Sequence, residues 1–318
     1  MKLPEMITIG ESMVVFSPNV PGPLRYVPQF TKHVAGAESN VCVGLTRLGH
    51  SAGFIGRLGD DEFGHYIVNS LRGEGVDVSQ VEFDPLRPTG IYFKERRMPG
   101  QINVYYYRHG SAGSHLTPEI LNEDYFASAK ILHLTGITPA LSDSCRETVF
   151  EAIRLARKHG LFISFDPNIR LKLWSKEEAK RVLTEIISQV DLLLPGLDEG
   201  EIIFGTDTPE SLVQAASNLG VQKVVVKLGA SGCYVWDGKP VGFVPGYAIR
   251  DVVDPVGAGD GFAAGLLSGI LDGLSLRDAA DLGNAVGAYA TTTYGDAEGL
   301  PTRRELRSFL TRADEVER

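Results

Sequence analysis

The segment VVDPVGAGDGFAAGLLSGI, from Val252 to Ile270, carries the clearest structural signal in the 318-residue chain. Apolar residues recur at helical spacing after Asp260, so a helix is predicted to begin near Ala258. Gly257 and Gly259 then lie at its amino end, where the absence of side chains lets backbone N–H groups approach an anion closely. The segment therefore predicts an anion-binding helix terminus.

Asp260, in the first turn of this predicted helix, has two interpretations. The positive end of a helix stabilises the charge of a carboxylate, so the basicity of Asp260 is expected to stay low, which suits a base needed only at the transition state. Alternatively, Asp260 simply caps the helix, and the glycines allow close packing. The spacing alone leaves both interpretations open.

Outside this segment, short buried strands alternate with helices. The runs MITIG, ILHLTG, LFISFD, DLLLPG and KVVVKLG are typical of parallel core strands. Residues 38–48 are typical of the helices between them, because Val41, Leu45 and Leu48 share one face and Gly49 follows. Repeated alternation of strand and helix predicts an α/β sandwich.

Two regions break the alternation, residues 13–35 and residues 87–108. Both have strand-like content without a following helix, most clearly in GIYFKERR and INVYYYR. They are predicted to form a small β-rich lid, within a single domain of residues 1–318, because no long linker rich in Pro, Gly or Ser divides the chain. Exposed sheet edges favour pairing, so a homodimer or higher homo-oligomer through the lid is expected.

Composition excludes several classes of protein. Hydrophobic residues make up 43% of the chain and charged residues 22%, which indicates a large core and excludes a disordered protein. The net charge of -9 argues against nucleic acid or anionic membranes as partners. The amino terminus has no apolar core of signal-peptide length, and no stretch approaches the roughly 20 apolar residues of a membrane span, so a cytoplasmic protein is expected.

Two motifs far apart in the chain point to one family. The string DPVGAGDGFAAG resembles the second signature of the ribokinase (pfkB-type) family of sugar kinases, and residues 35–59 resemble the first. Cys42 departs from the first signature, where a small Ser, Thr or Ala is usual. The resemblance covers essentially the whole chain and implies a ribokinase-like three-layer α/β/α sandwich with a small β-sheet lid. The residues at the spacing of the first signature are Gly36, Asn40, Gly49 and Gly59.

Four other strings resemble the 2-keto-3-deoxygluconate kinase branch of that family. The branch implies ATP-dependent phosphorylation of the terminal C6 hydroxyl of 2-keto-3-deoxygluconate, giving 2-keto-3-deoxy-6-phosphogluconate and ADP. One alternative is a fructokinase or another neutral-sugar kinase of the family, and a second is a non-catalytic sensor of sugar or nucleotide on the same fold. The strings are GAESN at Gly36, YYYRHGSAGSHL at Tyr105, FDPNIRLKLW at Phe165 and GDAEG at Gly295.

Two arginines give a physical argument for an acidic sugar. The guanidinium groups of Arg108 and Arg170 match a carboxylate in bidentate fashion, although each could instead form an ion pair. Arg170 follows the strand LFISF, and α/β folds bind ligands at the carboxyl ends of their strands. The resemblance implies a sugar site comprising Gly36, Ala37, Asn40, Tyr92, Tyr106, Arg108, Arg170 and Asp296.

The nucleotide is expected to lie near a glycine-rich turn that joins the strands KVVV and CYVW. A β-hairpin alone would explain that turn, and the resemblance makes it an ATP loop. No GxxxxGK[ST] loop is present, which excludes a P-loop kinase. The resemblance makes Asp260 the catalytic base beside an anion hole of Gly257, Ala258 and Gly259. The implied ATP-binding residues are Asn168, Arg170, Lys227, Gly229, Ala230, Gly232, Gly257, Gly259 and Asn284.

Two acidic residues resemble metal-site residues of the family. Glu199 matches the glutamate of an NxxE motif that arranges Mg²⁺ and its waters, but Gly196 stands where Asn is expected. Alternatively, Glu199 is a solvated carboxylate early in a helix over residues 198–204. Asp254, with backbone carbonyls near Thr293 and Gly295, resembles the monovalent-cation site. The expected cofactors are therefore ATP and Mg²⁺, with K⁺ as a further candidate.

Overall fold

The computed structural model describes residues 3–98 and 101–316, in which a nine-stranded sheet forms the centre of the molecule. Its strand order is β13-β12-β11-β10-β9-β8-β1-β4-β5. Neighbours from β11 to β5 are parallel, whereas β12 and β13 are antiparallel. The strands are β1 (Met6–Ile9), β4 (Ala52–Gly59), β5 (Asp77–Asp84), β8 (Ile131–Thr135), β9 (Phe162–Asp166), β10 (Leu192–Leu193), β11 (Lys223–Lys227), β12 (Gly232–Asp237) and β13 (Pro240–Pro245).

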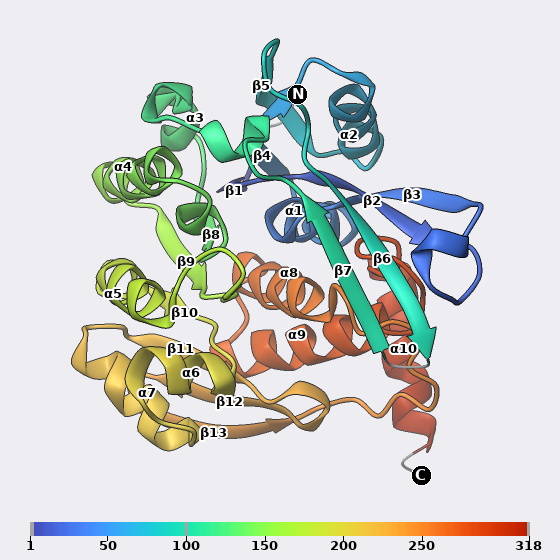
Figure 1. The fold of residues 1–318 in the computed structure, drawn as a ribbon. Helices are drawn as coiled ribbons and strands as arrows, with labels where there is room; N and C mark the ends of the chain where they lie inside the picture. Colours follow the sequence, from blue (N-terminus) through green and yellow to red (C-terminus); the bar gives the residue numbers. More distant parts are fainter. Residues whose placement is uncertain (1–2, 99–100, 317–318) are drawn as a thin grey trace.

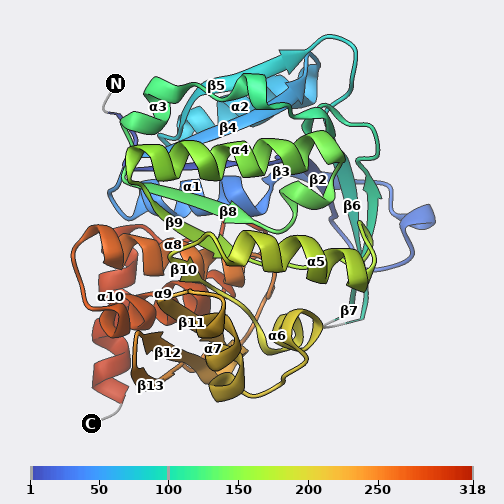
Figure 2. The ribbon, with the colours of Figure 1, turned by 90° about the vertical axis from the view of Figure 1, so that its left-hand side faces the viewer.

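Helices cover both faces of this sheet, which makes the three-layer α/β/α arrangement expected from the sequence (Figures 1 and 2). Across the described residues, no helix has the length and apolar character that crossing a membrane would require. One face carries α3 (Glu123–Ala127), α4 (Asp143–His159), α5 (Lys176–Ile187), α6 (Leu197–Phe204) and α7 (Pro209–Asn218). The other face carries α1 (Ala37–Arg47), α2 (Glu62–Gly73), α8 (Ala258–Leu271), α9 (Leu276–Ala290) and α10 (Arg303–Val316).

Each face has its own hydrophobic core because side chains alternate along a strand. In β11, Val225 packs with the core beneath α1 and α8, whereas Val224 and Val226 pack with the opposite core beneath α4 and α5. In the same way, Met6 and Ile7 of β1 belong to different cores. Burial on both faces explains why these strands are continuous apolar runs rather than alternating ones.

Polar side chains cap several of these helices. The hydroxyls of Ser175 and Thr208 accept hydrogen bonds from backbone N–H groups in the first turns of α5 and α7. Helix α8 begins at Ala258, as predicted. After Thr117 only a short 3₁₀ turn forms, Pro118–Ile120, because the chain becomes extended at Leu121. Other 3₁₀ turns occupy Leu24–Tyr26, Ala112–His115, Thr138–Ala140 and Gly229–Ser231.

A separate four-stranded sheet forms in the two regions predicted as the lid. Its order is β3-β2-β6-β7, and β6 and β7 form a two-stranded arm across the front of the molecule (Figure 1). Tyr92 of β6 is paired with Tyr106 of β7, and Lys94 with Val104. Residues 99 and 100 of the predicted lid lie outside the described residues. The strands are β2 (Met13–Pro18), β3 (Phe30–Ala35), β6 (Ile91–Met98) and β7 (Gln101–Tyr107).

Candidate active site

A cavity of about 370 Å³ lies between the four-stranded sheet and the carboxyl ends of the central strands. Strands β4 and β8 lie on opposite sides of β1, and such a change of direction in an α/β sheet is where ligands bind. The start of α1, the end of β9 and the loop before α8 complete its wall. The predicted site residues that line it are Gly36, Ala37, Asn40, Tyr92, Tyr106, Arg108, Asn168, Arg170, Lys227, Gly257, Gly259, Asp260 and Asp296.

Other predicted residues lie outside this lining. Asn284 is buried in α9, and its Nδ2 donates to the carbonyls of Val244 and Pro245 at 3.2 and 3.0 Å. In this structure its amide therefore ties α9 to β13 instead of facing the cavity. The glycine-rich turn after Lys227 connects antiparallel β11 and β12, as predicted. The predicted residues outside the lining are Ala258, Glu199, Gly229, Ala230, Gly232, Asp254 and Asn284.

Asp260 lies in the cavity at the first turn of α8, and Asn40 Nδ2 donates a 2.7 Å hydrogen bond to its Oδ2. Burial raises the pKa of Asp260 to about 7, opposed by the Asn40 hydrogen bond and reinforced by the charges of Asp166 and Asp296. The expectation that the helix end keeps its basicity low is therefore wrong, because removal from water outweighs the helix terminus. A carboxylate with a pKa near 7 accepts a proton effectively at neutral pH.

The anion hole predicted before Asp260 has a backbone that only glycine adopts easily. Gly257 has φ 82°, and a Cβ there would lie 2.2 Å from the carbonyl oxygen of Asp296. At Gly259, in contrast, a Cβ would meet no atom within 4 Å, so its backbone is accessible from the cavity. Since α8 begins here, its unpaired N–H groups and dipole favour a bound anion.

Arg108 and Arg170 lie in different electrostatic environments. Arg108 is buried at the end of β7 and forms an ion pair with Glu11, which also accepts a 2.6 Å hydrogen bond from Ser111 Oγ. The ion-pair alternative thus applies to Arg108, although the pair is buried rather than at the surface. Arg170 is exposed to the cavity and forms no ion pair among the described residues, only a 3.5 Å hydrogen bond to the carbonyl of Ile169. Its charge is available for a ligand.

Several residues that line the cavity were not predicted from the sequence, namely Glu11, Glu38, Lys94 and Asp166. Glu38 is buried, and its Oε1 accepts hydrogen bonds from Thr135 and Thr138 at 2.6 and 2.8 Å. Burial raises the pKa of Glu38, and these hydrogen bonds oppose the rise. Position along the chain could have identified two of these residues, because Glu11 follows the first strand and Glu38 lies in the first turn of α1.

Asp166 and Lys227 form an ion pair at the carboxyl edge of the sheet, with Nζ 2.6 Å from Oδ2. Burial lowers the pKa of Lys227, but the charges of Asp166 and Glu199 outweigh burial and hold this pKa above its ordinary value. The two residues end β9 and β11, which flank β10. The lysine is therefore a fixed positive charge in the cavity.

Glu199 uses both carboxylate oxygens in hydrogen bonds to the backbone. It accepts from Gly196 N at 2.7 Å and from Ile169 N at 2.9 Å. The alternative of a solvated carboxylate is wrong, and the helix begins at Leu197 rather than at residue 198. Within residues 3–98 and 101–316, no group of three or more His, Cys, Asp or Glu side chains could hold a metal ion. Protein side chains alone therefore do not build a metal cage here.

Asp296 and Asp254 both form ion pairs with the buried ammonium of Lys94. Lys94 Nζ lies 2.5 Å from Asp296 Oδ1 and 3.6 Å from Asp254 Oδ2. Tyr92 donates a 2.8 Å hydrogen bond to the other oxygen of Asp296, and Asp254 Oδ1 accepts from Val256 N at 3.1 Å. Both oxygens of Asp296 thus have partners, so binding a sugar hydroxyl would require sharing or exchange of one of them.

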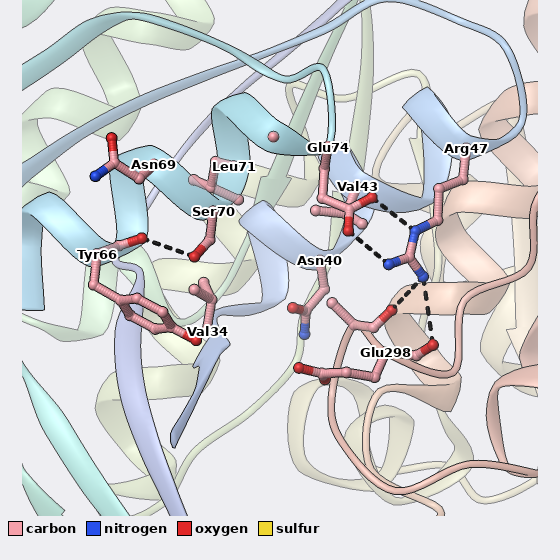
Figure 3. A pocket seen from close by; sticks show the side chains of 12 residues that line it. Val34, Asn40, Val43, Arg47, Tyr66, Asn69, Ser70, Leu71, Glu74 and Glu298 are labelled. Carbon is pink, nitrogen blue, oxygen red and sulfur yellow. Dashed lines mark hydrogen bonds and ion pairs between the residues drawn. The ribbon is translucent and has the colours of Figure 1, made fainter. Parts of the chain in front are cut away.

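A second cavity, of about 330 Å³, lies behind Asn40, which lines both cavities (Figure 3). Arg47 binds Glu74 there through two hydrogen bonds of 2.9 and 2.8 Å. Its third nitrogen donates to the carbonyls of Ala297 and Glu298 at 2.8 and 3.4 Å (Figure 3). The same nitrogen donates to the carbonyl of Leu300 at 2.7 Å. Arg47 therefore fastens α1 to the loop that follows Asp296, with its own charge compensated.

Comparison with known proteins relates this site to sugar kinases. Residues 4–303 match the pfkB family carbohydrate kinases. The chain is 44% identical over 312 residues to a 2-dehydro-3-deoxygluconokinase from Bacillus subtilis, covering 98% of this chain and 96% of the relative. It is 42% identical over 315 residues to one from Thermoproteus tenax, covering 96% and 94%. Fructokinase-2 of Solanum lycopersicum is less similar, at 35% over 317 residues, covering 96% and 95%.

Solved structures share the whole fold. A PfkB protein from Polaromonas superposes with a TM-score of 0.87 at 39% identity, covering 96% of this chain and 99% of that one. A putative Ribokinase II from E. coli, in complex with ATP and Mg²⁺, superposes with a TM-score of 0.89 at 27% identity, covering 98% and 100%. The ribokinase-like fold expected from the sequence is thereby confirmed.

Proposed function

The chain belongs to the pfkB family of carbohydrate kinases, and on that premise we propose that it phosphorylates the C6 hydroxyl of 2-keto-3-deoxygluconate with ATP. The products are 2-keto-3-deoxy-6-phosphogluconate and ADP. One observation carries the proposal: Asp260, a helix end suited to an anion and the free guanidinium of Arg170 line the same cavity. The higher identity to two 2-dehydro-3-deoxygluconokinases than to a fructokinase supports the acidic sugar.

The transfer step follows from this arrangement. The C6 oxygen attacks the γ-phosphorus of ATP, its proton passes to the Asp260 carboxylate, and the bond to the ADP oxygen breaks. Backbone N–H groups from Gly257 to Gly259 and the α8 dipole offset the negative charge on the moving phosphoryl group. With a pKa near 7, about half of the Asp260 carboxyls are ionised at neutral pH and most at slightly alkaline pH, and the ionised form can accept the proton.

ATP and Mg²⁺ are the expected cosubstrate and metal. Asn168, Arg170 and Lys227 face the cavity beside the anion hole, and we assign the turn of Gly229, Ala230 and Gly232 to the nucleotide as well. Mg²⁺ usually binds through substrate phosphates and waters, which fits a site without a carboxylate cage, and it would neutralise phosphate charge. Glu199 would contact only the waters of that ion.

Recognition of the sugar acid is assigned to the end of the cavity beneath the lid. The rings of Tyr92 and Tyr106 pack there at a tilt of 44° with centroids 5.2 Å apart, and the guanidinium of Arg108 lies 5.6 Å from the centre of the Tyr106 ring. Gly36 and Ala37 present backbone at the start of α1. Glu11 compensates the charge of Arg108. We therefore assign the substrate carboxylate to Arg170.

We expect Arg170→Met to lower kcat/KM for 2-keto-3-deoxygluconate by roughly 10- to 100-fold, because a charge-assisted hydrogen bond contributes about 1.5 to 3 kcal/mol. Turnover of any neutral sugar that the wild type accepts should fall less, because such a sugar has no carboxylate for Arg170 to bind. ATP-dependent ADP release with 2-keto-3-deoxygluconate, fructose and ribose measures both effects. Arg181→Met, at an exposed position on α5, is the matched control and should behave as wild type.

The same acceptor panel separates the alternatives. A wild-type preference for fructose would leave a sugar kinase but remove the case for an acidic substrate. Binding of ATP without transfer to any of the three acceptors would instead favour a non-catalytic sensor.

We also propose a homodimer through the outer face of the lid. Tyr105 and Tyr107 are 44% and 65% exposed there, and the Phe93 ring packs against those of Phe16 and Phe30 on the same sheet. Aromatic side chains of this kind are enriched at interfaces. Sedimentation should find the wild type as a dimer, and Tyr107→Glu should weaken association by roughly tenfold or more. A wild-type monomer at micromolar concentration would exclude this assembly.

A further inference from the structure

Lys94 is a buried lysine in the lid, with only 3% of its surface exposed. Side chains alternate along β6, so Lys94 points to the same side as Tyr92, into the cavity. Lysine is almost never this buried unless its charge is paired. Its function therefore depends on the groups around its ammonium.

The ammonium joins the two chain segments that shape the anion hole. Asp254 begins the loop that leads to Gly257, and Asp296 belongs to the loop packed against Gly257, whose missing Cβ leaves room for the Asp296 carbonyl. Lys94 Nζ lies 2.5 Å from Asp296 and 3.6 Å from Asp254. The ammonium of Lys94 thus offsets the electrostatic repulsion between the carboxylates of Asp254 and Asp296, which lie on the two segments beside the anion hole.

The other side of the Asp296 loop is already fixed. Arg47 donates to the carbonyls of Ala297 and Leu300, and Tyr92 donates to the second oxygen of Asp296. Lys94 links this loop to Asp254 through ion pairs with both carboxylates. Removing the charge of Lys94 should loosen the Gly257 backbone. It would not remove any group that contacts the reacting atoms.

The same contacts do not fit a bound K⁺ at Asp254. Its Oδ1 accepts from Val256 N at 3.1 Å and its Oδ2 lies 3.6 Å from the ammonium, so both carboxylate oxygens already have a partner. The nearby carbonyl of Thr291 accepts from the backbone N–H groups of Val253 and Asp254 at 2.8 and 3.2 Å. A second cation beside the ammonium would also be repelled by it.

We propose that Lys94 serves as a built-in monovalent cation that positions the anion hole, so that phosphoryl transfer by this enzyme does not require K⁺. The rate measurement rests on the proposed kinase function. Binding of K⁺ at Asp254 can be tested without turnover, through its effect on Tm. Lys94 is a positioning residue here, since it acts through Asp254 and Asp296.

The test compares wild type and Lys94→Met in potassium, sodium and tetramethylammonium chloride at equal ionic strength, with Mg²⁺ present throughout. Wild-type kcat should be the same in all three salts. The variant should lose roughly 10- to 100-fold in tetramethylammonium, as expected when a group that orients catalytic donors is removed, and should recover in K⁺. Its Tm should likewise rise in K⁺ relative to tetramethylammonium, whereas the wild-type Tm should not.

Two controls sharpen this comparison. Lys130→Met removes an exposed lysine that pairs with Glu5 far from the cavity, and it should show no dependence on K⁺. Lys94→Met combined with Asp254→Asn removes the carboxylate that a rescuing K⁺ would use, so the rescue should disappear.

Either of two results would overturn the proposal. One is stimulation of the wild type by K⁺ of more than about fivefold, the lower end of a typical coupling between two sites. The other is a variant whose rate and Tm respond to K⁺ no more than those of the wild type. If Lys94→Met fails to fold, the wild-type measurements alone still show whether K⁺ stimulates the enzyme. Absence of turnover with every acceptor would count against the kinase function, and the Tm measurements would still test Lys94.

Discussion

Asp260→Asn should lower kcat by roughly 10²- to 10⁴-fold, which is the contribution of a positioned general base. Asparagine has nearly the same shape as aspartate but cannot take the proton from the C6 hydroxyl. The hydrogen-bond partner Asn40 remains in place, so the cavity should keep its form. ADP release measures the loss of rate, and calorimetric titration with ATP should show that nucleotide binding is retained. Near wild-type kcat in the variant would exclude Asp260 as the base.

The pH dependence of the wild type tests the same assignment independently. Protonated Asp260 cannot accept a proton, so kcat/KM should rise as pH increases through about 7 and then level off. Asp260→Asn should lack this rise. A wild-type profile that is flat across this range, or a variant that keeps the rise, would contradict the raised pKa.

The raised pKa of Asp260 also fixes the sign of a stability effect. In the unfolded chain this carboxyl ionises near its ordinary pKa of 3.8, whereas in the folded protein burial raises the pKa to about 7. Folding therefore loses stability as pH rises between these values, because the unfolded state gives up its proton first. The stability gained by Asp260→Asn should be absent at acidic pH and largest above pH 7, as measured by thermal unfolding across this pH range.

Gly257→Ala should reduce kcat by roughly 10²-fold or more, as the loss of an oxyanion donor does in other enzymes. The new Cβ would lie 2.2 Å from the Asp296 carbonyl, so the backbone of the anion hole must move. Positive φ adds strain of about 1 to 2 kcal/mol for an L-residue. Steady-state kinetics with saturating ATP and sugar acid would measure the loss.

Gly273→Ala is the matched control for Gly257→Ala. Gly273 follows α8 with φ 77°, and a Cβ there would meet no atom within 4 Å. This variant carries the backbone strain without the collision, so it should lose some Tm and keep its kcat. Equal loss of activity in the two variants would attribute the effect to general destabilisation instead of to the anion hole.

The local sequence pattern predicted those site residues whose positions depend only on a few neighbours in the chain. Gly257 and Gly259 precede α8 as expected, and Tyr92 and Tyr106 lie opposite each other on the two lid strands that the aromatic runs indicated. Asn284 shows the limit of this approach, because the family resemblance placed it among the ATP-binding residues, whereas its amide donates hydrogen bonds to β13. A sequence resemblance can single out a residue, but it does not show which groups its side chain hydrogen-bonds in the folded protein.

The α/β class, the lid strands and the start of α8 follow from local sequence pattern, because hydrophobic periodicity, caps and glycines act over a few residues. The charge state of the site depends on the tertiary structure. Asp260 has its pKa raised by burial and by the carboxylates of Asp166 and Asp296, Glu11 compensates Arg108, and Lys94 bridges Asp254 and Asp296. These partners come from distant parts of the chain, and charge and burial depend on which residues the completed fold brings together.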